Sequence, residues 1–123
     1  MVRISILYPN KAGARFDFRY YTETHMPMSI RLLSAHEGFR GVTVAEGFSG
    51  AAPESPAPFI AMCSFDFESV KDFLCAFTPH AEELQNDVAN YTDIAPTIQY
   101  SEVLISIDPK VDHRMVEAEH VSL

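Results

Sequence analysis

The segment FDFRYYTETHMPM, from Phe16 to Met28, combines a helix start signal, several aromatic side chains and one histidine. Asp17 suits the N-cap position, because its carboxylate can accept hydrogen bonds from the free amides of the first helical turn, and Phe16 can pack against Tyr21 as a hydrophobic staple. If an α-helix follows Asp17, side chains three or four positions apart line one apolar face: Phe18, Tyr21, His25, Met28 and Leu32. The segment therefore predicts a helix with a histidine in the middle of its apolar face.

Pro27 makes the turn beside this histidine unusual. Proline has no amide hydrogen, so the carbonyl of Glu23 lacks its usual helical donor, and the proline ring crowds the turn. We expect a kink or a widened turn next to His25, whose imidazole can give or take a proton near neutral pH. A single histidine on an apolar helix face is more often a hydrogen-bonded core residue than a catalyst. The adjacent tyrosines favour a pocket without deciding between the two.

Length and composition indicate one folded domain. The chain has 123 residues, of which 47% are hydrophobic and 21% are charged, which is typical of a globular protein with a substantial core. No apolar run approaches the roughly twenty residues that cross a bilayer, and the first residues lack the pattern of a secretory signal. The net charge of -8 argues against nucleic acid and anionic membranes as partners. Cys63 and Cys75, both expected in the core, give no disulfide framework and favour a reducing cytoplasm.

The remaining elements follow from hydrophobic periodicity and from the turn residues that end each run. Four runs are predicted to be strands: residues 2–8, 39–47, 59–67 and 97–107. The first helix should end near Ser34 or Ala35, and a second helical region should begin near Ser69 and continue to about Tyr91. The order β-α-β-β-α-β predicts an α+β, ferredoxin-like fold, in which two helical regions cover one face of a four-stranded antiparallel sheet.

The other face of that sheet would have no helix on it. It should carry apolar side chains such as Ile60 and Met62 and part of the last strand, and a large apolar patch is usually buried. The common solution is a second copy of the chain, so we expect a homodimer. The domain is assigned to residues 1–107, and residues 108–123 are either a frayed tail or an arm that lies over the partner subunit.

Two groups of residues resemble the EthD family, which is named for ethyl tert-butyl ether degradation. The first group is Phe16-Asp17, Tyr20-Tyr21 and His25-Met26-Pro27. The second group is Asp87 to Asp93, followed by Pro96 and Ser101-Glu102. The resemblance implies a dimeric α+β barrel, in which two ferredoxin-like subunits pack sheet to sheet. It also implies metabolism of small hydrophobic organic compounds, because relatives are described as oxidoreductase-like, as isomerases of ring lactones, or as cyclases and dehydratases. It does not fix one reaction.

We expect a pocket between the sheet and the first helix, with these residues in or near its wall: Tyr21, His25, Met28, Phe39, Phe65 and Tyr91. In an enzyme, His25 would abstract or relay a proton of a bound carbonyl compound, and Tyr21 would hold or protonate the oxygen on which charge develops. Asp87 would either orient the imidazole or be a surface or capping residue. His25 and Tyr21 are thus the predicted catalytic residues, and the others, with Asp87, are predicted to contact the substrate.

Other classes of function stay open. A binding or accessory protein would use the same pocket to carry a hydrophobic intermediate for a monooxygenase system, and a purely structural protein would have no cavity. Related dimeric barrels bind or degrade haem. A haem protein with His25 as an axial ligand is therefore an alternative to an enzyme without a cofactor. The histidines show no metal-ligand pattern, and the chain has no glycine-rich phosphate loop, so we predict neither a metal site nor a nucleotide site.

Overall fold

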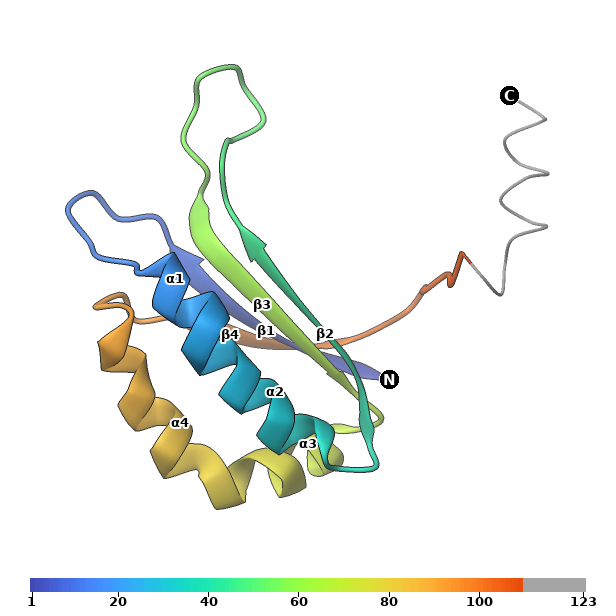
Figure 1. The fold of residues 1–123 in the computed structure, drawn as a ribbon. Coiled ribbons are helices and arrows are strands. Elements are labelled where there is room, and N and C mark those ends of the chain that lie inside the picture. Colours follow the sequence, from blue (N-terminus) through green and yellow to red (C-terminus); the bar gives the residue numbers. More distant parts are fainter. Residues whose placement is uncertain (110–123) are drawn as a thin grey trace, which may run out of the picture.

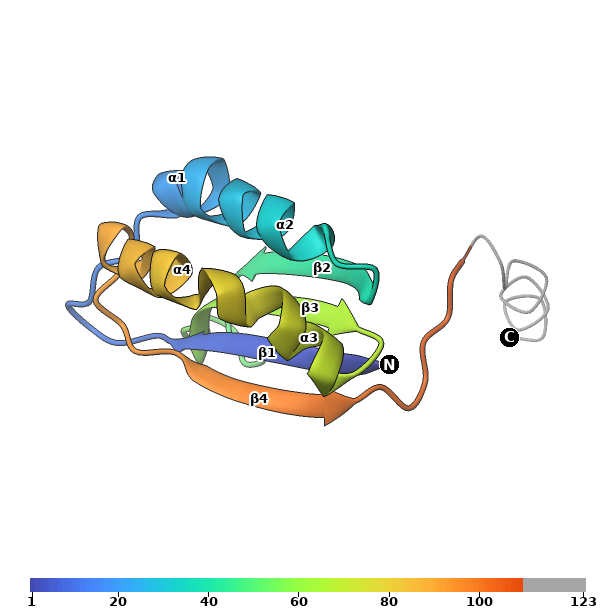
Figure 2. The ribbon, with the colours of Figure 1, turned by 90° about the horizontal axis from the view of Figure 1, so that it is seen from below.

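The computed structural model describes residues 1–109 of the chain. Most of the predicted tail, residues 108–123, therefore lies outside the described residues. The strands are β1 (Val2–Pro9), β2 (Phe39–Glu46), β3 (Phe59–Phe67) and β4 (Thr97–Glu102). They form one antiparallel sheet in the spatial order β2-β3-β1-β4, and the helices all lie on one face of it (Figures 1 and 2). The predicted ferredoxin-like α+β fold is confirmed.

Each helical region is made of short consecutive segments. The first contains α1 (Phe18–Tyr20), the π-helical turn η1 (Tyr21–His25) and α2 (Met26–Ser34). The second contains α3 (Val70–Phe77), the 3₁₀ turn η2 (Thr78–His80), α4 (Ala81–Asp87) and the 3₁₀ turn η3 (Val88–Asn90). Asp17 caps the first region by accepting a hydrogen bond from the amide of Tyr20, and Ser69 caps the second by accepting one from the amide of Asp72. Both predicted helix starts are confirmed.

The widened turn that we expected beside Pro27 is present as η1. The amide of Met26 bonds to the carbonyl of Tyr21, five residues earlier, instead of to the carbonyl four residues earlier. The extra residue in this turn moves the inward-facing positions of α2 by one, so its buried residues are Met26, Ser29 and Leu33. The predicted apolar face is right as far as His25 and wrong after it, and Met28 is only half-buried.

The last strand is shorter than predicted, because β4 ends at Glu102 instead of residue 107. At that end of the sheet the amide of Val103 bonds to the carbonyl of Met1. The pairing with β1 ends at Glu102, which lies opposite Val2. Residues 103–109 leave the sheet as an extended segment (Figure 1).

The face of the sheet that the helices cover holds the core. Ile4, Phe65 and Phe67 on this face are at most 3% exposed. The residues of β4 that pair with Ile6 and Ile4 are Ile98 and Tyr100, so they lie on the helix side and not on the opposite face, where we expected the apolar part of the last strand.

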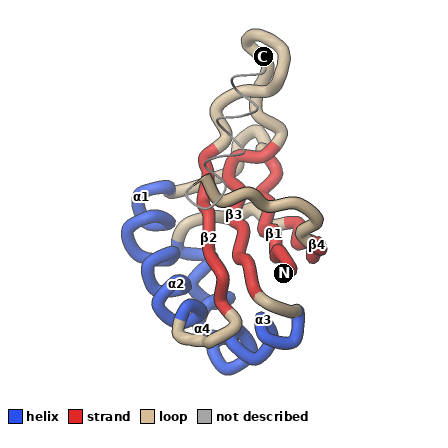
Figure 3. The backbone as a smooth tube through the Cα atoms, turned by 90° about the vertical axis from the view of Figure 1, so that its right-hand side faces the viewer, coloured by secondary structure: helices blue, strands red, loops and turns tan. Residues whose placement is uncertain are grey.

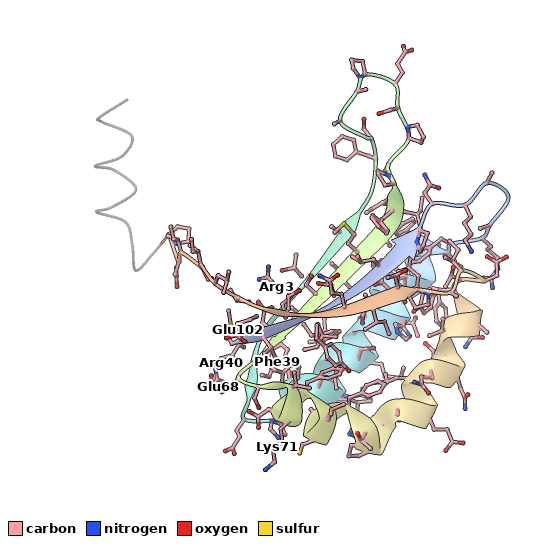
Figure 4. The ribbon with its side chains drawn as sticks, turned by 180° about the vertical axis from the view of Figure 1, so that it is seen from behind. Arg3, Phe39, Arg40, Glu68, Lys71 and Glu102 are labelled. Carbon is pink, nitrogen blue, oxygen red and sulfur yellow. The ribbon has the colours of Figure 1, made fainter. Side chains whose placement is uncertain are left out.

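The opposite face of the sheet is mixed in character. It carries Ile60 and the 45% exposed Met62, as predicted, but also an ion pair between Arg3 and Asp66, with Nε and Oδ1 2.8 Å apart. Figure 3 shows this side of the sheet, and Arg3 is labelled in Figure 4. The β2–β3 loop projects beyond the sheet (Figures 1 and 3) and carries Phe48, which is 94% exposed.

The two cysteines differ in their surroundings. Cys63 is buried on β3 as predicted, whereas Cys75 on α3 is exposed, because it points away from the apolar face on which Phe73 and Ala76 lie. Both are free thiols. Within residues 1–109, none of the helices has both the length and the apolar character that crossing a membrane requires.

Candidate functional site

A cavity of about 350 Å³ lies between the sheet and the two helical regions. Most of its wall is apolar: Ile6, Met26, Leu33, Cys63, Phe65, Phe73, Phe77, Leu84, Val88, Pro96 and Ile98. The polar side chains in the wall are Tyr8, Tyr21, His25, Ser29, Gln85 and Tyr91. A largely apolar cavity with a few convergent polar groups is typical of a site for a small organic ligand, and this volume lies at the lower end of the usual range.

His25 is held by an aspartate from the other helical region. Its Nδ1 lies 2.8 Å from Oδ2 of Asp87, the last residue of α4. The other oxygen of Asp87 accepts hydrogen bonds from the hydroxyl of Tyr20 at 2.6 Å and from the side-chain amide of Asn90 at 2.9 Å. Asp87 lies behind His25 and not in the cavity wall. Asp87 therefore lies where it can orient the imidazole, which was one of the two roles that we left open for it.

The environment of this pair favours a neutral imidazole beside an ionised carboxylate. Burial lowers the pKa of His25, and the hydrogen bond and charge of Asp87 offset only part of that effect. Burial alone would raise the pKa of Asp87, but hydrogen bonds from Tyr20, His25 and Asn90 outweigh it, so the pKa of Asp87 lies below its usual value. An ionised carboxylate can only accept hydrogen bonds, so the hydrogen of the neutral imidazole is assigned to Nδ1. Nε2 then presents a lone pair, as a general base requires.

A tyrosine hydroxyl lies next to that lone pair and is bonded to a second one. The hydroxyl of Tyr91 is 3.5 Å from Nε2 of His25 and 2.6 Å from the hydroxyl of Tyr8. Burial raises the pKa of both tyrosines, so both are neutral hydrogen-bond donors. The ring of Tyr21 stacks on His25, with the ring centroids 6.0 Å apart. The hydroxyl that the structure places beside Nε2 belongs to Tyr91, which bonds in turn to Tyr8, whereas we predicted Tyr21 for this place.

Four of the six residues that we predicted for the pocket line the cavity: Tyr21, His25, Phe65 and Tyr91. Met28 does not line it, because the π-helical turn η1 puts Met26 there instead. Phe39 does not line it either. It packs against Phe67, with ring centroids 5.7 Å apart, at the end of β2 next to Arg40 (Figure 4).

The residue that the sequence analysis missed is Tyr8. The alternation of the first strand already placed it on the same face as Ile4 and Ile6. A tyrosine at the end of an otherwise aliphatic strand face was the available signal. Alternation alone does not show that the end of β1 lies beside Tyr91. Among residues 1–109, no three His, Cys, Asp or Glu side chains are grouped so that they could hold a metal ion.

The lowered pKa values predict how stability depends on pH. Both groups bind a proton more weakly in the folded chain than in the unfolded chain, so acidification favours unfolding. The contribution of His25 to the free energy of unfolding begins to fall as the pH drops below about 6.5, and that of Asp87 as the pH drops below about 3.9. In urea unfolding between pH 7 and pH 5, we expect the free energy of unfolding of the wild type to fall and that of His25→Gln to fall less. His80→Gln is the matched control, and equal slopes for the wild type and His25→Gln would contradict the prediction.

The chain is similar to proteins of one known family. The EthD domain matches residues 13–95. An EthD-like protein from Ralstonia eutropha JMP134 is 40% identical over 87% of this chain and 95% of its own, with a TM-score of 0.81. An EthD family protein from Bacillus halodurans C-125 is 20% identical over 85% of this chain and 99% of its own, with a TM-score of 0.63.

A hydroxynitrile lyase from Passiflora edulis shares the fold, with a TM-score of 0.60 and 17% identity over 87% of this chain and 96% of its own. No curated protein matches the chain. The family match and the 40% identical structure both span the region that holds His25 and Asp87. The chain therefore belongs to the EthD family, within the dimeric α+β barrel superfamily.

Proposed function

We propose that this protein is an enzyme that moves a proton of a small, largely apolar carbonyl compound, with His25 as the base. The observation that carries the proposal is the asymmetric environment of the imidazole. Nδ1 is held by Asp87 at 2.8 Å, whereas His25 also lines an apolar cavity of about 350 Å³. A histidine that only filled the core would not need a carboxylate partner on one side and a cavity on the other.

The reaction that fits these groups is proton abstraction from a carbon next to a carbonyl. The C–H bond breaks, its proton goes to Nε2 of His25, and its electron pair moves toward the carbonyl oxygen. The carboxylate of Asp87 stabilises the imidazolium that forms, and hydroxyl groups near Nε2 stabilise the negative oxygen. Return of the proton to another atom of the substrate completes an isomerisation or a cyclisation. Such a step serves the degradation or the biosynthesis of small ring compounds, and an oxidoreductase of this family would use the same base.

Two other functions are less well supported. A carrier for a monooxygenase system would use the apolar cavity but would have no use for the Asp87–His25 pair. Because Nδ1 is bonded to Asp87, His25 could hold a haem iron only through Nε2, and Nε2 faces the Tyr91 hydroxyl at 3.5 Å. An iron bound to Nε2 would have to displace that hydroxyl.

Hydrogen exchange tests the proposed chemistry without knowledge of the natural substrate. The probes are 2-indanone, cyclohexanone and δ-valerolactone in D₂O, with deuterium incorporation next to the carbonyl followed by proton NMR. The wild type should accelerate exchange of at least one probe, and His25→Gln should lower that acceleration roughly 10²- to 10⁴-fold. Asp87→Asn should also lower it, because the imidazolium loses its counter-charge.

His80→Gln is the control for this assay, since His80 lies outside the cavity wall. Circular dichroism checks that each variant is folded. Exchange that is equally fast in the wild type and in His25→Gln would remove His25 from the mechanism, and no acceleration of any probe would contradict the proposed function.

We also propose that the protein is a homodimer in a reducing, cytoplasmic setting. The sheet face opposite the helices carries Met62, which is 45% exposed, and the segment after β4 carries Leu104 and Ile105, which are 87% and 84% exposed. Apolar side chains of this size are usually covered. A second copy that packs on this face would bury Met62, which agrees with the barrel superfamily to which the chain belongs.

The dimer can be tested by light scattering after gel filtration. We expect twice the chain mass of 13.8 kDa for the wild type. Met62→Lys should shift the mass toward one chain, because a lysine cannot be buried there without a partner. Lys71→Glu on the exposed side of α3 is the control and should stay dimeric (Figure 4). A monomeric wild type, or a Met62→Lys variant as dimeric as the wild type, would overturn the proposal.

A further inference from the structure

Tyr8 and Tyr91 come from distant parts of the sequence and meet in the cavity wall. Their hydroxyl oxygens are 2.6 Å apart, and the two residues are 3% and 0% exposed. Both rings pack edge-on against Phe16, with ring centroids 5.2 and 5.4 Å from it. Both also contact the ring of Tyr21. The surrounding aromatic rings therefore hold the two hydroxyls at fixed positions, as a preorganised binding site requires.

The hydrogen atoms of this pair can be counted. Two hydroxyls carry two hydrogens, and the bond between them uses one. Within residues 1–109, the acceptor that the structure shows for the second hydrogen is Nε2 of His25, 3.5 Å from the Tyr91 oxygen. That separation is near the upper limit for a hydrogen bond, whereas a well-placed O–H···O bond is 2.7–2.8 Å long. A better acceptor in the cavity would therefore take the second hydrogen away from Nε2.

We propose that Tyr8 and Tyr91 form the binding site for the carbonyl oxygen of the substrate, and that its binding frees Nε2 of His25 to act as a base. This inference rests on the proposed function, because it takes the same cavity and the same base. It specifies the substrate class as a compound with a carbonyl oxygen that can only accept, and with hydrogen on the carbon next to the carbonyl group, such as a ketone or a lactone.

The arrangement also defines what the tyrosines do during the reaction. Both hold their own hydrogens firmly because they are buried. With its second hydrogen, the bonded pair therefore donates to the negative oxygen without giving up a proton to it. The proton that leaves carbon goes to Nε2, and the electron pair of the broken C–H bond is stabilised on the oxygen beside the hydroxyl pair. The apolar part of the substrate then lies against the phenylalanine and leucine side chains of the cavity.

Binding of two matched probes tests this site separately from catalysis. The probes are 2-indanone and indane, which have the same ring skeleton with and without the oxygen, and their dissociation constants are measured by calorimetry. Tyr8→Phe keeps the packed ring and removes the hydroxyl. We expect this variant to raise the dissociation constant of 2-indanone about five- to tenfold, as the loss of one hydrogen bond does. The dissociation constant of indane should change less than about twofold. Tyr91→Phe should behave in the same way, and it carries the test if Tyr8→Phe does not fold.

Tyr100→Phe is the control, because Tyr100 is 49% exposed and lies outside the cavity wall. It should change neither dissociation constant. The proposed oxygen site would be overturned if Tyr8→Phe and Tyr91→Phe weakened the binding of both probes equally, or if they left the binding of 2-indanone unchanged. His25→Gln separates the two proposals, since it should abolish hydrogen exchange but keep the preference for 2-indanone. A wild type that discriminates between the probes but exchanges no hydrogen would overturn the proposed function alone, and a wild type that binds neither probe would overturn both.

Discussion

The hydrogen bond between His25 and Asp87 is the contact on which the site depends. It joins η1 of the first helical region to the end of α4, across 62 positions of sequence, with Nδ1 and Oδ2 2.8 Å apart. It fixes the imidazole hydrogen on Nδ1, and it turns the lone pair of Nε2 toward the tyrosine hydroxyls. Without it, His25 would be a neutral aromatic side chain in an apolar wall, with no fixed orientation and no counter-charge.

The polar groups of the site form one chain of hydrogen bonds that runs from the surface to the cavity. Tyr20 and Asn90 hold Asp87, Asp87 holds His25, and His25 leads to Tyr91 and Tyr8. Among the described residues, no buried side-chain nitrogen or oxygen lacks a hydrogen-bond partner. Apart from Tyr21, Ser29 and Gln85, the rest of the wall is apolar. A ligand therefore meets its hydrogen-bonding partners at one corner of the cavity and packs against hydrocarbon elsewhere, which favours a small compound with a single polar end.

Sequence patterns predicted well those features that depend on neighbouring residues. The N-caps at Asp17 and Ser69, the bounds of the strand Phe59–Phe67 and the widened turn beside Pro27 are all local. The errors came from long-range effects. Met28 was placed in the pocket because a constant α-helical spacing was assumed beyond the turn, although the widening itself was expected. The last strand was drawn too long because its apolar residues continue after Glu102, where the pairing with β1 ends.

The sequence by itself determined the order of elements, the fold class, the family and the histidine at a distorted helical turn. Periodicity, capping residues and a proline act within a few positions of the chain, so they can be read without coordinates. The tertiary structure decided which groups surround that histidine. Asp87 and Tyr8 come from distant parts of the sequence. Only the packing of both helical regions on the sheet determines that Asp87 holds Nδ1, and that Tyr8 is linked to the Nε2 side through Tyr91.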